Sequence, residues 1–400
     1  MVRPRLEVGD IFRDRGDRYR REHAGHLSLG QLKVMSAIEH CRSAALGGHK
    51  LQCSDTACAT LRIAYNSCRN RHCPKCQGAA AEQWLAERQL DLLPIEYYHT
   101  VFTIPTQIAD IAYHNKAVIY DLMFKTAAET LRSIAADPKR LGARLGITAV
   151  LHTWGSAMTH HPHLHCIVTG GGLSPDGQRW VPCRPGYLLP HKVLSRRFRH
   201  LLLEQLHQAH HEHRLYFFGH HQKLADYKAF AAYLAPLRNL DWYVHIKPPF
   251  AGPEAVLEYL GRYTHRVALA NSRLITYDGH LVTFWHKNYR ADTVRHQPLT
   301  LDVDEFIRRF LIHVLPKGFH RIRHYGLLAS HVRNDNLTLA RTLLDNSSNP
   351  ISTATVTDSE NDDSPRSPYL CPACGAPMLI IQTFEPIPTA RDPPRLLNAA

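Results

Sequence analysis

Six of the ten cysteines lie between positions 41 and 76, and their spacing is typical of metal ligands. Two short pairs stand fourteen residues apart, and two such pairs can supply four thiolates to a tetrahedral Zn²⁺. We therefore predict a structural zinc site made by Cys53, Cys58, Cys73 and Cys76. Candidates for a second site, which the spacing does not allocate, are Cys41, Cys68 and His72, with His40 or His49. A group of buried thiols without metal is the alternative.

A late pair, Cys371 and Cys374, has the spacing of half a zinc site, and no Cys or His follows it. It is either a remnant or a pair that recruits ligands from elsewhere in the chain. Between the earlier cysteines, the basic residues Arg69, Arg71 and Lys75 predict a surface that faces a polyanion such as DNA. Zinc would stabilise a module that is too small to fold on its own core.

His163 and His165 flank Leu164 in a segment of strand-like composition. The two imidazoles are therefore expected on one face of a strand, with Leu164 on the other. Two histidines on one face can hold a divalent ion. The chain has 29 histidines, however, and the polar run 160–162 also fits a loop that enters a strand, so the pair indicates a metal site only in combination with other groups.

Tyr259 and Tyr263 are spaced by four residues in a segment opened by a Gly-Pro pair at 252–253, where proline favours the first helical position. This spacing places both phenols on one helix face and places Arg262 and Arg266 on a second stripe, where we expect the two arginines to contact DNA. An amphipathic helix that buries two aromatic rings has the same spacing. A phenol with a pKa near 10 attacks phosphate only beside a metal ion or a base, so the tyrosines and histidines together indicate phosphoryl transfer.

The charge of the chain also fits a polyanionic partner. Lys and Arg number 48 against 35 Asp and Glu, which gives a net charge of +13, although a basic protein without such a partner would show the same balance. No run of about 18 apolar residues occurs, and the Arg-rich first 22 residues lack the apolar stretch of a secretory signal. We therefore expect a protein inside the cell with no membrane partner.

The elements that must position these residues alternate between strands and helices. Strands are expected at 97–104, 147–153, 163–169 and 242–246, and Asp278-Gly279 predicts a hairpin within 273–287. Pro162 and the glycines at 170–172 are expected to mark the two ends of the strand at 163–169. Helices are expected at 27–38, 79–93, 108–136, 194–211 and 253–265. Antiparallel hairpins with inserted helices predict an α+β fold rather than a parallel sheet.

Five segments follow from this pattern. They are a helical N-terminal arm at 1–37, a zinc-binding module at 38–78, an antiparallel-sheet domain with helical flanks at 79–345, a flexible linker at 346–369 and a tail with the late cysteine pair at 370–400. The linker is rich in Ser, Thr, Asn, Asp and Pro and poor in apolar residues.

Several ordered blocks between residues 37 and 329 carry a specific resemblance. They are Tyr65-Asn-Ser-Cys-Arg-Asn-Arg-His-Cys-Pro-Lys-Cys76, Leu151-His-Thr-Trp-Gly155, His161-Pro-His-Leu-His165 with the glycines at 170–172, Lys247-Pro-Pro-Phe250, Tyr259-Leu-Gly-Arg-Tyr-Thr-His-Arg266 and Arg321-Ile-Arg-His-Tyr325. The chain thereby resembles HUH-type insertion-sequence transposases that move by a rolling-circle route, in the group with two active-site tyrosines and an N-terminal zinc-binding domain. The resemblance implies an antiparallel-sheet HUH nuclease domain preceded by the zinc-binding module.

The resemblance also implies an activity. His163 and His165 would bind Mg²⁺ or Mn²⁺, and Tyr259 or Tyr263 would attack a phosphate of single-stranded DNA at the end of the mobile element. The products would be a 5′-phosphotyrosine and a free 3′-hydroxyl. His152 is the candidate third ligand of this ion. Alternatively, His152 has a structural role and pairs with the Trp154 region. The expected partners are the element's end DNA and the target DNA, in the cytoplasm of a bacterium and at the nucleoid when DNA is bound.

One feature departs from the family pattern, since the four-residue gap between Cys53 and Cys58 is wider than a tight zinc knuckle. A competing hypothesis is a zinc-containing DNA-binding protein without catalysis, in which the histidines and tyrosines are structural. Composition fits both hypotheses, and a covalent adduct with DNA would separate them.

Overall fold

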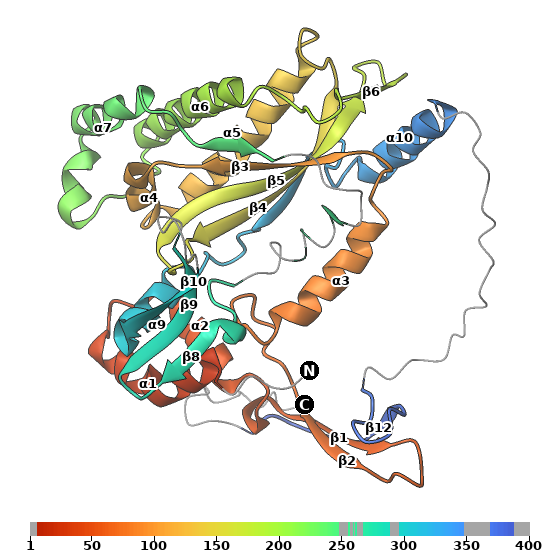
Figure 1. Ribbon diagram of the computed structural model, residues 1–400. Coiled ribbons are helices and arrows are strands. Elements are labelled where there is room, and N and C mark those ends of the chain that lie inside the picture. The colour runs from red at the N-terminus through yellow and green to blue at the C-terminus, as the bar shows by residue number, and fades with distance from the viewer. Residues whose placement is uncertain are drawn as a thin grey trace, which may run out of the picture.

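The largest element of the fold is a six-stranded antiparallel sheet in the order β11-β4-β5-β3-β7, with β6 paired to β5 (Figure 1). The structure, a computed structural model, describes residues 6–247, 255–256, 259, 261, 267–288, 296–347 and 369–387. The strands of this sheet are β3 (Tyr97–Thr103), β4 (Arg144–Trp154), β5 (His160–Leu173), β6 (Trp180–Pro182), β7 (Val244–Ile246) and β11 (Ile322–Gly326). The predicted α+β class with antiparallel strands is confirmed.

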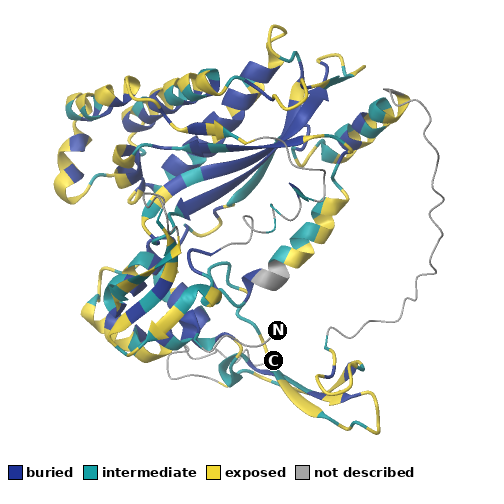
Figure 2. Cartoon of the chain, viewed as in Figure 1, coloured by how far each residue is buried: buried dark blue, intermediate teal, exposed yellow. Residues whose placement is uncertain are grey.

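Helices cover one face of this sheet and form the main core with it. They are α4 (Thr106–Ala112), α5 (Lys116–Ala136), α6 (His191–His211) and α7 (Tyr227–Leu234). Leu164, Cys166 and Val168 of β5 point into this core together with Phe102 of β3. Because side chains alternate along a strand, His163 and His165 lie on the opposite face, as the sequence predicts. Figure 2 shows how deeply the central strands are buried.

Strand β5 is longer than the sequence predicts, since it runs from His160 to Leu173 and includes both Pro162 and the three glycines that were expected to end it. A Cβ atom at Gly170 would lie 2.6 Å from the carbonyl oxygen of Glu96, and one at Gly172 would lie 2.2 Å from that of Arg144. The glycines therefore permit close backbone approach inside the sheet rather than a turn.

A second core joins the N-terminal helices to a small sheet of order β10-β9-β8. Its elements are α1 (Val8–Glu22), α2 (Leu29–His40), α9 (Val303–Leu311), β8 (Leu274–Tyr277), β9 (Leu281–Lys287) and β10 (His296–Asp302). The ring of Phe12 packs on that of Phe310 with centroids 5.4 Å apart. The predicted hairpin is confirmed, with Gly279 at φ +96° between β8 and β9. Residues of the predicted arm thus share a core with residues 268–314, which the sequence assigns to another segment.

Polar side chains fix the start of two of these helices. The Ser28 hydroxyl accepts a hydrogen bond from the backbone N–H of Gln31, and the Gln31 side-chain oxygen accepts one from the Ser28 N–H, so that α2 begins with a complete capping box. The Asp302 carboxylate accepts a hydrogen bond from the Asp304 N–H at the start of α9.

The third sheet brings together distant parts of the chain, in the order β12-β1-β2. It consists of β1 (Gly48–Cys53), β2 (Leu61–Tyr65) and β12 (Met378–Phe384), and it projects from the rest of the molecule (Figure 1). The segment predicted as a separate C-terminal tail therefore contributes a strand to the zinc-binding module. This strand pairing is long-range, so spacing along the chain does not reveal it.

The remaining helices flank the histidine face of the large sheet or its end. They are α3 (Gln77–Gln89) and α10 (Arg333–Ser347). Four short 3₁₀ turns lie elsewhere: η2 (Gly219–Ala225) and η3 (Ala235–Arg238) pack with the helices of the main core, η1 (Ala44–Leu46) contacts α2, and η4 (Asn271–Arg273) contacts β9. Most of the predicted linker, at 348–368, lies outside the described residues. Among the helices that the structure describes, none has the length and apolar character needed to cross a bilayer.

Candidate active site and cysteine clusters

Three histidines meet on the open face of the large sheet. His152 of β4 stands directly opposite His163 of β5, and His165 is two residues further along the same strand. One ring nitrogen from each of the three lies within 4.8 Å of the others, which is a spacing that one metal ion can bridge. Strand register thus places the predicted third ligand His152 beside the predicted pair.

Hydrogen bonds and stacking orient these imidazoles. Nδ1 of His163 lies 2.7 Å from the carbonyl oxygen of His161, so this nitrogen carries the proton and donates, which leaves Nε2 with a lone pair. The His152 ring stacks on Trp154 with centroids 4.7 Å apart. The ring that contacts Trp154 also faces the other two histidines, so pairing with Trp154 is compatible with a ligand position for His152.

Burial keeps the imidazoles of His163 and His165 neutral. It lowers the pKa of His163 to about 4 and moves the pKa of His165 well below its ordinary value, with the neighbouring histidines adding to the effect on His165. A neutral imidazole is the form that binds a metal ion. The three residues therefore fit a divalent cation in spacing, and His163 and His165 also fit it in protonation state.

His99 links this group to Tyr259. Nε2 of His99 lies 2.8 Å from Nδ1 of His165, and the Tyr259 hydroxyl lies 2.8 Å from Nδ1 of His99. Burial is the first cause that lowers the pKa of His99 to about 3, and the Lys247 cation is the second. Sequence reasoning missed His99, although it predicted the strand that carries it, because no motif marks the residue and only its register against β5 reveals its role.

Tyr259 lies in a helical segment that packs on α3. The described residues Ala255, Val256, Tyr259 and Gly261 of this segment are helical. Val256 and Tyr259 pack in one cluster with Trp84 and Leu85 of α3. The second predicted nucleophile Tyr263, and the predicted DNA-contacting Arg262 and Arg266, lie outside the described residues.

A cleft of about 550 Å³ opens over the histidines and Tyr259. Its cationic residues are Lys247, Arg273 and Lys287, and among the described residues its lining contains no Asp or Glu. Trp285 and Tyr243 also line the cleft, with 44% and 61% of their surface exposed. A cationic cleft with accessible aromatic rings suits a strand of nucleic acid, because phosphates meet the cations and bases can stack on the rings.

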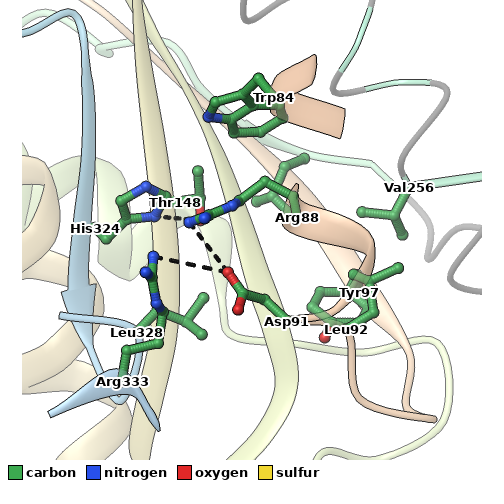
Figure 3. A pocket seen from close by; sticks show the side chains of 11 residues that line it. Trp84, Arg88, Asp91, Leu92, Tyr97, Thr148, Val256, His324, Leu328 and Arg333 are labelled. Carbon is green, nitrogen blue, oxygen red and sulfur yellow. Dashed lines mark hydrogen bonds and ion pairs between the residues drawn. The ribbon is translucent and has the colours of Figure 1, made fainter. Parts of the chain in front are cut away.

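A much smaller cavity of about 30 Å³ lies on the same face of the sheet (Figure 3). There Arg88 of α3 and Arg333 of α10 both point to Asp91, with nitrogen–oxygen distances of 3.0 and 3.7 Å. His324 bonds to Thr148 nearby at 3.0 Å. This volume holds about one water molecule, so the cavity anchors α3 on the sheet and is too small for a substrate.

The cysteines form two groups of four, and this grouping corrects the predicted allocation. One group is Cys41, Cys68, Cys73 and Cys76, and the other is Cys53, Cys58, Cys371 and Cys374. The predicted site of Cys53 and Cys58 with Cys73 and Cys76 is therefore split between the two. The late pair recruits partners from the N-terminal module, which was one of its two interpretations.

The first group has the geometry of a zinc site. The Sγ atom of Cys76 lies 3.5 Å from that of Cys41 and 3.6 Å from that of Cys68. The sulfur–sulfur edge of a tetrahedron with zinc–sulfur bonds of 2.3 Å is about 3.8 Å. His72 is not in this group, because its Nε2 accepts a hydrogen bond from the Leu315 N–H at 3.4 Å.

Two of the three basic residues predicted to face DNA are engaged inside the chain. Arg71 donates to the carbonyl oxygens of Pro316 and Phe319, and the Lys75 ammonium lies 2.5 Å from the Glu7 carboxylate. Arg69 is exposed. The contacts of Arg71 and Lys75 therefore give these residues a structural role, while Arg69 retains the geometry of a surface contact.

The histidine group has the spacing for a metal ion, the cleft over it is cationic, and the two cysteine groups have the spacing for zinc. Two family models match the chain, one described as "Putative transposase" over residues 146–336 and one as "Transposase zinc-binding domain" over residues 11–104. The chain belongs to the IS91 family of transposases with an N-terminal zinc-binding domain.

Two relatives support this membership. The chain is 52% identical over 401 residues to the putative transposase y4qJ of Sinorhizobium fredii, with 99% of both chains covered. It is 28% identical over 320 residues to the transposase for insertion sequence element IS801 of Pseudomonas savastanoi pv. phaseolicola, with 76% of this chain and 71% of that one covered. No solved structure matches.

Proposed function

We propose that this transposase nicks single-stranded DNA at the ends of its element and transfers the strand through a 5′-phosphotyrosine, in rolling-circle transposition. The observation that carries the proposal is the continuous contact from the Tyr259 hydroxyl through His99 to the histidine group on one sheet face. A nucleophile beside a metal-binding group is the arrangement that phosphoryl transfer by tyrosine requires.

His152, His163 and His165 are the residues that would hold a divalent ion. Three imidazole nitrogens suit Mn²⁺ better than Mg²⁺, because Mg²⁺ prefers oxygen ligands and binds nitrogen more weakly. The ion supplies Lewis-acid polarisation of the scissile phosphate when it is bound. The proposal therefore favours Mn²⁺ of the two ions that the resemblance implies.

His99 positions the nucleophile in this proposal. When Nε2 of His165 serves as a ligand, Nδ1 of His165 carries the proton and donates to Nε2 of His99. Nδ1 of His99 then donates to the Tyr259 oxygen, 2.8 Å away, and stabilises negative charge there. The cation of Lys247, 5.7 Å from the centre of the Tyr259 ring, acts in the same direction.

The strand transfer needs no external energy source. The Tyr259 oxygen forms a bond to phosphorus while the bond from phosphorus to the 3′ oxygen breaks, the phenol loses its proton and the departing 3′ oxygen gains one. One phosphodiester replaces another, so a later 3′-hydroxyl can reverse the exchange on a new strand. A second tyrosine, Tyr263, would allow two such exchanges in succession.

The cleft supports a single-stranded substrate. Lys247, Arg273 and Lys287 can meet phosphates, and the exposed rings of Tyr243 and Trp285 can stack on unpaired bases. The group of Cys41, Cys68, Cys73 and Cys76 would hold a structural zinc ion. This ion would fix the zinc-binding module beside the second core, because three of the four thiols are buried in that core.

Covalent attachment to DNA tests the proposal. Purified protein with Mn²⁺ and a single strand carrying the element's end sequence, labelled at its 3′ end, should give a labelled protein adduct on a denaturing gel. Tyr259→Phe or Tyr263→Phe should reduce the adduct and the double variant should abolish it, whereas Tyr187→Phe, at an exposed tyrosine outside the cleft, should leave it unchanged.

Other outcomes decide against the proposal. Normal nicking by the double Phe variant refutes the nucleophile assignment. Binding of the end sequence without nicking, in Mn²⁺ and in Mg²⁺, favours a zinc-containing DNA-binding protein without catalysis.

A further inference from the structure

The late cysteines lie outside both segments that the family models match, yet they complete a four-thiol group with the N-terminal module. The Sγ atoms of Cys53 and Cys374 are 3.4 Å apart, and those of Cys58 and Cys371 are 3.7 Å apart. A disulfide would bring two sulfurs to about 2.05 Å. A tetrahedral ZnS₄ site has sulfur–sulfur edges of about 3.8 Å, which the observed distances approach.

Both cysteine pairs are held in tight turns at the end of the β12-β1-β2 sheet. The Cys371 carbonyl accepts from the Gly375 N–H at 2.9 Å, and Gly375 has φ +77°, where a side chain would be strained. On the other side, the Asp55 carbonyl accepts from the Cys58 N–H at 3.2 Å. The two turns face each other across the strand pairing of β1 with β12, which runs from Gly48 to Cys53.

The sheet has too little apolar burial to hold these turns by itself. Its buried cluster consists of Leu51, Cys53, Cys371 and Met378. Other apolar side chains of the same strands are largely exposed, among them Leu61, Ile63, Leu379 and Ile380. Figure 2 shows the exposed surface of this sheet. A module with so small a core needs a further covalent or metal link to be stable.

We propose that Cys53, Cys58, Cys371 and Cys374 bind a second Zn²⁺, and that this ion fastens the C-terminal strand β12 to the N-terminal zinc-binding module. The ligands of this site are more than 300 residues apart in sequence, since Cys53 and Cys374 are separated by 321 positions. The site joins two chain segments on either side of the nuclease domain, and it is independent of the nicking chemistry.

The zinc content of the unaltered chain and of cysteine variants tests which cysteines bind the second ion. The full chain, purified with zinc and without exogenous chelator, should contain two equivalents of zinc, one for each group of four cysteines. The double variant Cys371→Ser/Cys374→Ser should contain one, as should Cys53→Ser. Cys183→Ser, at a cysteine outside both groups, should retain two. One equivalent in the unaltered chain, or two in the double variant, overturns the proposal.

Cleavage of the chain before β12 tests whether the zinc site holds this strand to the N-terminal module. A protease site inserted between residues 348 and 368 allows the full chain to be cut after folding. The fragment that contains β12 should remain with the rest of the protein in gel filtration, leave it after addition of a chelator, and stay bound in a reducing agent without a chelator.

The same cut variant with Cys371→Ser and Cys374→Ser should release the fragment at once. Release by reductant alone would indicate disulfides, and retention after the chelator has removed both zinc equivalents would indicate that strand pairing alone holds β12. Either result overturns the proposal.

Discussion

Replacement of Gly261 by alanine should slow covalent attachment to DNA, because Gly261 lies where the helix that carries Tyr259 contacts α3. A Cβ atom built on Gly261 would lie 2.6 Å from Cδ1 of Leu85 and 3.4 Å from its Cγ and Cδ2. Ordinary carbon–carbon contacts are about 3.5–4.0 Å, so the new methyl group overlaps Leu85 by about 1 Å. Leu85 packs in the same cluster as Tyr259, which limits its freedom to rotate away.

The size of the effect follows from this overlap. Alanine is more favourable than glycine in a helix by about 1 kcal/mol, whereas overpacking costs about 1–3 kcal/mol, so the net change in the free energy of unfolding should be small. A shift of the helix by about 1 Å would displace the Tyr259 oxygen relative to the histidines. Misplacement of this size can lower a rate by about 100-fold, and we expect a loss of roughly 10- to 100-fold.

The assay is single-turnover adduct formation with 3′-labelled strand, for Gly261→Ala, Leu85→Ala and the double variant. The double variant should recover to the rate of Leu85→Ala alone, because truncation of Leu85 removes the overlap. A Gly261→Ala rate equal to that of the unaltered protein would refute the idea that contact with α3 positions the nucleophile. A double variant as slow as Gly261→Ala would show that the loss has another cause.

Three further expectations concern charge and metal binding. Arg71→Ala should lower the free energy of unfolding by about 1–3 kcal/mol in denaturant titrations, because two partly buried carbonyl groups lose their charged donor. The matched Arg69→Ala should leave stability unchanged and should reduce the slope of the logarithm of the DNA-binding constant against the logarithm of salt concentration by about 0.7. His163→Ala should abolish Mn²⁺ binding in calorimetry without change in zinc content, and retained Mn²⁺ binding would contradict the ligand assignment. Burial, assisted by two nearby arginines, lowers the pKa of His324 to about 4, so the folded state favours the neutral ring. This stabilisation is present above about pH 6.5 and is lost as the pH falls from 6.5 towards 4. His324→Asn should make the unfolding free energy less steep over that range without removing the slope, because other buried histidines titrate there too, and an unchanged pH dependence would contradict it.

The alternation of side chains predicted the part of the fold that holds the histidines. Leu164 between His163 and His165 marks a strand with one buried and one open face, and the structure has that strand and that partition. The extent of the strand was not predictable in the same way, because glycine has two common roles. At Gly170 and Gly172 its role is to admit neighbouring backbone, which depends on strands that are distant in sequence.

For a similar reason, spacing along the sequence could not predict which cysteines form each group of four. Loop length alone favours Cys73 over Cys371 as a partner of Cys58, because a short loop costs less entropy to close. The strand pairing of β12 with β1 decides the matter, and it has no local signature in the sequence. His99 was missed on the same grounds, since its contact with His165 results from register between β3 and β5.

The order of β1, β2 and β12 has a consequence for biosynthesis. Cys58 leaves the ribosome 313 residues before Cys371 does, and at about 5–20 residues per second this separation corresponds to roughly 15–60 seconds. During that interval Cys53 and Cys58 lack the other two ligands of the proposed second zinc site. The four cysteines of the first group, Cys41, Cys68, Cys73 and Cys76, have all been synthesised and can already bind zinc. A prematurely terminated chain would therefore carry one finished cysteine site and one open pair, and metal content would report whether translation had passed Cys374.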